Sequence, residues 1–190
     1  MKYKLIITLA AYLLVSSPFF AQKKGSINGV ISASGTSNTH DWIVKTDQFS
    51  GTFDINETNA VTNLSVKIPV ASLKSTLTSG FERKQMENLV LKTFNHSKNP
   101  TIVFEVNDEF TPAIKGNEAD VTLTGNLSMA GVTKRISFKS TGVKLSNGNY
   151  KFTATIPMTF TEYGMKPPTA LIVMKVKDPL ILKLDITISQ

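Results

Sequence analysis

The chain has 190 residues, of which 41% are hydrophobic and 18% are charged, and it contains no cysteine. This length predicts one domain with a sizeable core, the composition excludes a disordered chain, and the lack of cysteine excludes disulfides and thiolate chemistry. The net charge of +7 comes from basic residues scattered along the sequence. A nucleic-acid site would need a clustered basic patch. We therefore interpret the charge as a source of solubility, with at most weak, transient attraction to anionic membrane surfaces.

Residues 1–21 are predicted to be a secretory signal peptide that does not belong to the fold. Lys2 and Lys4 give a positive start, an apolar run covers 5–15, and small or polar residues lead to Ala21. The run is shorter than the ~20 residues that span a bilayer, so a retained membrane anchor is the weaker interpretation. We expect cleavage after Ala21, a mature domain over 22–190, and a periplasmic or secreted location.

Alternation of apolar and polar residues dominates the mature sequence, for example over 152–160 and 180–188. This period of two is typical of strands with one dry face and one wet face. Polar links such as Asn147-Gly148 have the composition of hairpin turns. We predict about eight strands, over residues 26–36, 42–56, 61–70, 101–110, 118–131, 133–145, 149–159 and 179–189.

Two segments depart from this pattern. Ser79 and Glu82 have the spacing of a capping box, and apolar residues recur after them at helical spacing, which predicts a short helix over about 80–91. The stretch 161–168 is irregular. Within it, Tyr163 and the pair Pro167-Pro168 form either a rim over a barrel mouth or an ordinary rigid loop.

About eight amphipathic strands joined mostly by short links predict an all-β fold, a single antiparallel β-barrel with the helix near one end. A barrel of this size is either filled by its side chains or holds one small ligand. Several residues expected to face inward are small, which favours a cavity: Gly29, Ala33, Gly35, Gly51, Gly125 and Ala154.

The cluster His40-Asp41-Trp42 has two interpretations. It meets a ligand head group or supplies an acid–base pair, or it is a structural corner in which His40 bonds the backbone and Trp42 fills the barrel. Neighbouring residues in a strand point to opposite faces, so His40 and Asp41 are poorly placed to act as one catalytic pair. Two histidines are too few for a histidine-rich metal site, no cofactor is expected, and no nucleophile or nucleotide-binding motif occurs.

The order and spacing of several segments resemble the YceI-like family of exported bacterial proteins over about residues 26–189. The segments are Gly35-Thr36-Ser37 with His40-Asp41-Trp42, Phe49-Ser50-Gly51, the helix around Met86 and Leu89, Asn99-Pro100 through Phe104, Gly125 through Lys134, the stretch 161–168, and Val176-Lys177-Asp178. One position departs from the family pattern, because Asn99 stands where a tyrosine is often found before the proline.

The resemblance implies a lipocalin-like barrel with a helix across one end and an apolar tunnel for a polyisoprenoid or similar chain. It implies a lipid-binding protein for transport or storage and not an enzyme. We place three groups of residues at the ligand: Trp42, Phe49, Phe53, Phe104, Leu127, Met158 and Phe160 against the chain, Met86 and Leu89 closing the tunnel, and Tyr163 at its rim. His40 and Asp41 are assigned to the head group or to structure.

Two other functions stay open at this point. One is a barrel enzyme that acts on a small apolar substrate and uses His40 or Asp41 as acid or base. The other is a stress-related secreted barrel with a filled core and a protein partner. The sequence leaves open whether the protein forms a homodimer.

Overall fold

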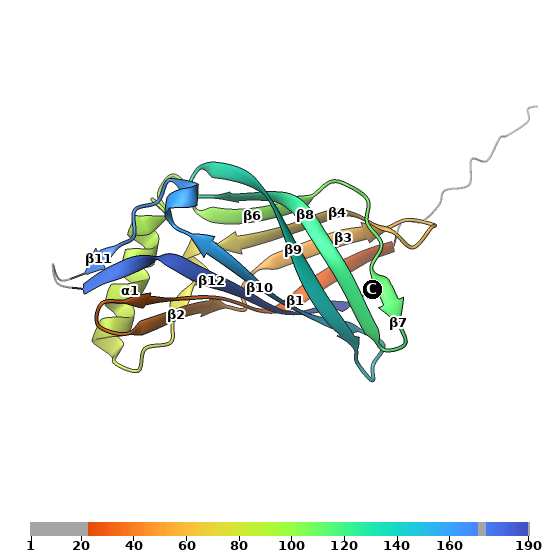
Figure 1. Cartoon of the computed structure of the whole chain (residues 1–190), viewed down its shortest axis with the longest axis horizontal. Coiled ribbons are helices and arrows are strands. Elements are labelled where there is room, and N and C mark those ends of the chain that lie inside the picture. The colour runs from red at the N-terminus through yellow and green to blue at the C-terminus, as the bar shows by residue number, and fades with distance from the viewer. Residues whose placement is uncertain (1–22, 171–173, 190) are drawn as a thin grey trace, which may run out of the picture.

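Eight antiparallel strands close into a barrel in the computed structural model, which describes residues 23–170 and 174–189 (Figure 1). Around the barrel each strand pairs with the next, and the pairing of the last strand with the first closes the circle. In circular order the strands are β1 (Lys23–Ser37), β12 (Met174–Ser189), β10 (Tyr150–Thr159), β9 (Val132–Lys144), β8 (Glu118–Met129), β6 (Thr101–Val106), β4 (Val61–Pro69) and β3 (Ser50–Ile55). The predicted all-β barrel is therefore confirmed.

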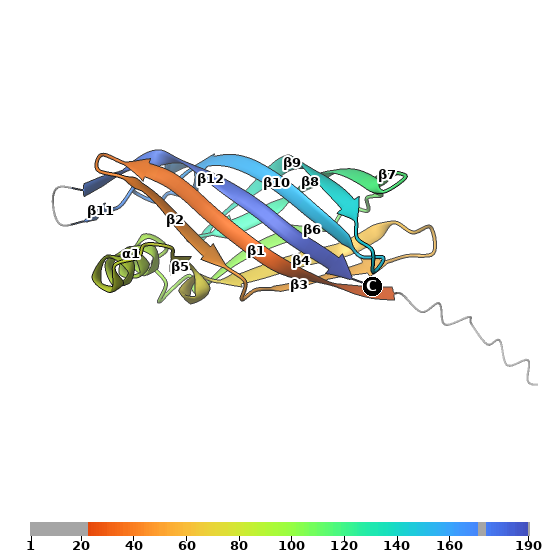
Figure 2. The ribbon, with the colours of Figure 1, turned by 90° about the horizontal axis from the view of Figure 1, so that it is seen from below.

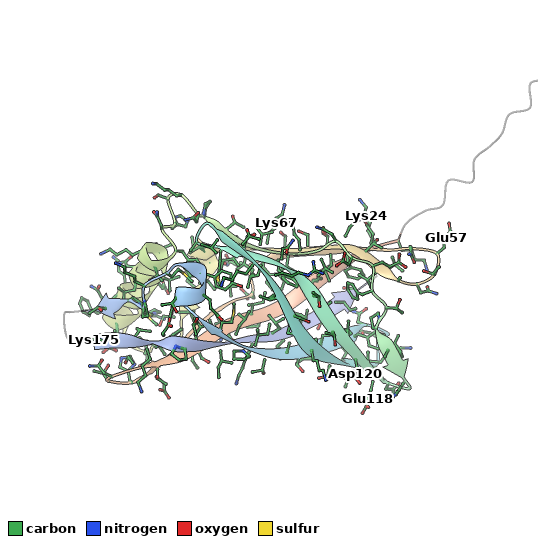
Figure 3. The ribbon with its side chains drawn as sticks, turned by 45° about the horizontal axis from the view of Figure 1, so that its top comes forward. Lys24, Glu57, Lys67, Glu118, Asp120 and Lys175 are labelled. Carbon is green, nitrogen blue, oxygen red and sulfur yellow. The ribbon has the colours of Figure 1, made fainter. Side chains whose placement is uncertain are left out.

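The alternation in the sequence sets the inner and outer faces of these strands. In β10, Phe152, Ala154, Ile156 and Met158 are buried, while the residues between them are mostly exposed. The two faces follow directly from the two-residue period of an extended chain. Charged side chains lie on the outside, as Lys24 and Lys67 illustrate in Figure 3.

The predicted single strand over 42–56 is wrong, because the structure has two strands there. β2 (Asp41–Thr46) pairs with the second half of β1, and β3 pairs with its first half. At the end of β2 the buried Thr46 accepts a hydrogen bond from the Gln48 N–H at 2.9 Å and donates one to Ser72 Oγ at 2.9 Å. This polar turn redirects the chain, although the residues around it alternate like a strand.

Helix α1 (Gly80–Thr93) lies across the end of the barrel at which β1 turns into β2 (Figures 1 and 2). The predicted cap is present, since Ser79 Oγ accepts a hydrogen bond from the Glu82 N–H at 3.4 Å. The remaining elements are short: η1 (Val70–Ser72), β5 (Lys74–Ser75), β7 (Ala113–Lys115), η2 (Thr161–Tyr163) and β11 (Thr169–Ala170). In the described part of the chain, no helix is long and apolar enough to cross a membrane.

Inward glycines do not supply the free space that the sequence led us to expect. A Cβ on Gly51 would lie 2.5 Å from Ile27 Cβ, and one on Gly35 would lie 2.5 Å from Trp42 Cζ2. At Gly125 a Cβ would lie 2.4 Å from the carbonyl oxygen of Glu105, so this glycine permits close approach of β6 and β8. Large side chains and neighbouring backbone occupy the places that the glycines leave.

The interior contains two apolar clusters. The smaller one consists of Ile27, Phe53, Ile55 and Val61, which pack at the end of the barrel that holds the β3–β4 turn. Figure 3 places Glu57, in that turn, at the opposite end of the molecule from Lys175, which lies near α1. The larger cluster lies in the α1 half and includes residues from strands around the barrel. The far end is thus closed by packed side chains.

Candidate ligand-binding site

The α1 half of the barrel encloses a cavity of about 150 Å³, here called the inner cavity. Strands from around the barrel supply its wall, and α1 with its C-cap residue contributes Met86, Leu89, Val90 and Phe94 at one end. Apart from Thr93, the lining side chains are aliphatic, aromatic or thioether groups. Such a wall offers dispersion contacts and exclusion of water, and it offers almost no directional bonding.

Strand β12 forms one continuous stripe of this wall. Leu180, Leu182, Leu184 and Ile186 face the cavity at every second position. They pack against the main apolar cluster, and each is only partly buried. The predicted ligand contacts do not include this stripe, although the strict alternation of β12 in the sequence is a signal for it.

Methionine is concentrated at the cavity. The chain has six methionines, and Met86, Met129, Met158 and Met165 line the inner cavity. Their unbranched side chains rotate easily and adapt to irregular shapes. The wall can therefore change its shape more readily than one built from branched residues.

Eight of the ten residues that the sequence assigned to the ligand lie in the cavity wall. They are Trp42, Phe49, Met86, Leu89, Phe104, Leu127, Met158 and Phe160. Of the aromatic ones, Trp42 and Phe104 lie in β2 and β6, while Phe49 directly precedes β3 and Phe160 directly follows β10. The ring centroids of Trp42 and Phe160 are 6.1 Å apart, and those of Phe104 and its wall neighbour Phe138 are 5.6 Å apart. Contact of these residues with a ligand stays a prediction.

Phe53 and Tyr163 lie outside the wall of the inner cavity. Phe53 is 3% exposed and belongs to the cluster at the far end, where its ring covers Gly25. Tyr163, in η2, is 1% exposed and packs in the main cluster. Burial raises the pKa of its phenol, and the Glu162 carboxylate raises it further, so the group stays neutral. The structure thus gives both residues packing positions.

Two hydrogen bonds hold the irregular stretch 161–168 against the start of β12. Thr161 donates hydrogen bonds from its backbone N–H and its hydroxyl to Asp178, at 3.0 and 2.6 Å. The hydroxyl bond is the main cause that lowers the pKa of the Asp178 carboxyl. These contacts tie the stretch 161–168, which supplies Met165 and Pro168 to the wall, to the start of β12.

A second pocket of about 90 Å³, here called the outer pocket, adjoins the inner cavity beside α1. Trp42, Met86, Leu89 and Val176 line both spaces, so these side chains form the partition between them. Unlike the inner cavity, the outer pocket has polar groups in its wall: Ser37, His40, Glu82 and Gln85.

His40 and Asp41 separate as expected for neighbours in an extended chain. His40 lines the outer pocket, and its Nδ1 lies 2.8 Å from the backbone carbonyl oxygen of Asp41. Asp41 is exposed on β2, opposite Thr36 of β1. Within residues 23–170 and 174–189, no group of three or more His, Cys, Asp or Glu side chains is arranged to hold a metal.

A family model described as a YceI-like domain matches residues 21–188. The fold is similar to that of Burkholderia cenocepacia BcnA, with a TM-score of 0.60 and 16% identity over 87% of this chain and 96% of that chain. It is also similar to a polyisoprenoid binding domain from Saccharophagus degradans implicated in plant cell wall breakdown, with a TM-score of 0.63 and 12% identity over 86% and 96%. A Campylobacter jejuni YCEI protein has a TM-score of 0.53 and 19% identity over 75% and 81%. Comparison with curated protein sequences finds no match.

Proposed function

Since the chain belongs to the YceI-like family, we propose that it is an exported, non-enzymatic carrier that holds a polyisoprenoid or similar long apolar chain in its barrel. The observation that carries this proposal is the unfilled, almost wholly apolar inner cavity. The polyisoprenoid-binding domain with the same fold supports the class of ligand. Transport or storage of a water-insoluble molecule is the role that such binding would serve.

The energetics of the cavity suit an apolar chain. Each CH₂ equivalent removed from water contributes about 0.8 kcal/mol, so a long tail binds tightly without a specific hydrogen bond. A cavity of about 150 Å³ is of a size that accepts a single small ring in a rigid core. A longer tail would need more room, and rotation of the lining methionines supplies a way to provide it. We propose that the cavity widens along its axis as the ligand enters.

The enzyme alternative has less support. Among the described residues no side chain hydrogen-bonds the imidazole ring of His40, whose Nδ1 lies against the backbone carbonyl oxygen of Asp41. The filled-core alternative does not account for the free space beside β12. Export rests on the signal-peptide pattern of residues 1–21, which lie outside the described residues, and remains a proposal. Homodimer formation and contact with a membrane surface are not required by the proposed function.

Trp42 offers a direct test, because it is the one tryptophan of the chain and it lines the cavity. We expect its fluorescence to change on titration with polyprenols, and we expect the affinity to rise with the number of isoprene units because each unit buries more apolar surface. Mature protein without bound lipid is needed for the titration. An affinity that does not depend on chain length, or a signal that does not saturate, would contradict the proposal.

A further inference from the structure

We propose that the outer pocket is the subsite for the head group of the bound chain and that it selects an uncharged hydroxyl or carbonyl over a phosphate. This inference rests on the proposed function, because a head group reaches the outer pocket only when its tail lies in the inner cavity. It goes further by naming the chemical class of the ligand's polar end.

The position of the outer pocket supports this assignment. It shares Trp42, Met86, Leu89 and Val176 with the inner cavity. A ligand whose tail lies in the inner cavity and whose other end extends past these residues would place that end among polar side chains. The other end of the barrel is closed by the cluster of Ile27, Phe53, Ile55 and Val61. A polar head group would lose its hydrogen bonds to water there without replacement. The ligand should therefore bind with its tail toward Phe53 and its head beside α1.

The charges around the two spaces disfavour an anion. Glu82 is the one charged side chain among the described residues that line either space, and no lysine or arginine does so. Arg83 and Lys84 lie on other faces of α1, since the lining positions 81, 82, 85, 86 and 89 occupy one side of the helix. A phosphate monoester carries roughly −1.5 to −2 charges at pH 7 and would face the Glu82 carboxylate.

Hydrogen-bonding groups in the same pocket suit a neutral head. The Asp41 carbonyl can only accept a hydrogen bond, so Nδ1 of His40 carries the proton in this contact. In the neutral ring, Nε2 is then an acceptor for a hydroxyl. The Gln85 amide can donate to a hydroxyl or carbonyl oxygen. An alcohol or a quinone-type carbonyl finds partners here without a change of charge.

The test compares a polyprenol with the polyprenyl monophosphate of the same length, by titration of Trp42 fluorescence in the mature protein. We expect the alcohol to bind at least tenfold more tightly than the phosphate. Glu82→Lys should strengthen phosphate binding and so lower the ratio of alcohol affinity to phosphate affinity at least fivefold. This effect of the substitution should be smaller at high salt, because charge interactions are screened. Glu82→Gln should give an intermediate ratio and leaves the backbone cap from Ser79 in place.

Glu57→Lys is the matched control, because it makes the same charge change at the far end of the barrel (Figure 3). It should leave the ratio unchanged. Phosphate binding as tight as alcohol binding in the unaltered protein, or an equal effect of Glu82→Lys and Glu57→Lys, would overturn the head-group assignment while leaving the carrier function intact. Failure of both ligands to bind would overturn the carrier function itself.

Discussion

Ala33→Phe should abolish most of the binding of a long apolar chain while leaving the barrel folded. Ala33 is the one small residue among the predicted inward positions that lines the inner cavity, between Val44 and Leu182 on the adjacent strands. A phenylalanine there would occupy the free space that the ligand needs. We expect the affinity for a polyprenol to fall at least tenfold, which corresponds to about 1.4 kcal/mol. Titration followed by fluorescence measures the affinity, and circular dichroism reports the fold.

Ser32→Phe is the control for this substitution. Ser32 is the preceding residue of β1, so its side chain lies on the outer face, opposite Lys45 and Lys183 on the paired strands. The same change in size outside the barrel should leave the affinity unchanged. Equal losses in both variants would show that the effect comes from the strand and not from the cavity.

Phe53→Ala should be the most destabilising of the substitutions considered. Phe53 is 3% exposed, packs in the cluster at the far end, and covers Gly25, whose missing side chain makes room for the ring. Removal of a buried phenylalanine side chain costs about 3–5 kcal/mol, because transfer energy is lost and a cavity remains. Chemical denaturation should report this as a lower free energy of unfolding.

The exposed Phe81 of α1 gives the matched comparison, since it is 66% exposed. Phe81→Ala should change the free energy of unfolding by no more than about 0.5 kcal/mol. A loss below about 1 kcal/mol for Phe53→Ala would contradict the view that packed side chains close the far end. The orientation proposed for the ligand would then lose its basis.

The strands and the helix could be predicted from the sequence because both depend on local periodicity. Alternation over 152–160 and 180–188 marks β10 and β12, and the Ser79–Glu82 spacing marks the start of α1. The break between β2 and β3 could not be predicted in this way. It depends on a hydrogen bond from Thr46 to Ser72, 26 positions away in the sequence.

The candidate site shows the same division between local and distant effects. The alternation of residues along each strand shows which side chains face inward, and Trp42, Phe104 and Met158 lie in the cavity wall as predicted. Alternation does not give the position of a residue along the barrel axis. The sequence therefore did not predict that Phe53 lies in the packed far end. It also does not tell whether an inward glycine leaves space. Gly51 and Gly125 are covered by atoms from neighbouring strands, so the free volume lies elsewhere.

Native mass spectrometry of the protein purified from its own host tests most directly whether this barrel carries a long apolar chain. We predict a chain that lacks residues 1–21 and carries one apolar lipid per molecule, released on organic extraction and identified as an isoprenoid by its fragments. The same spectrum should show no phosphate on that lipid if the outer pocket selects a neutral head group. A protein that is free of lipid as isolated and stays free after incubation with polyprenols would contradict the account.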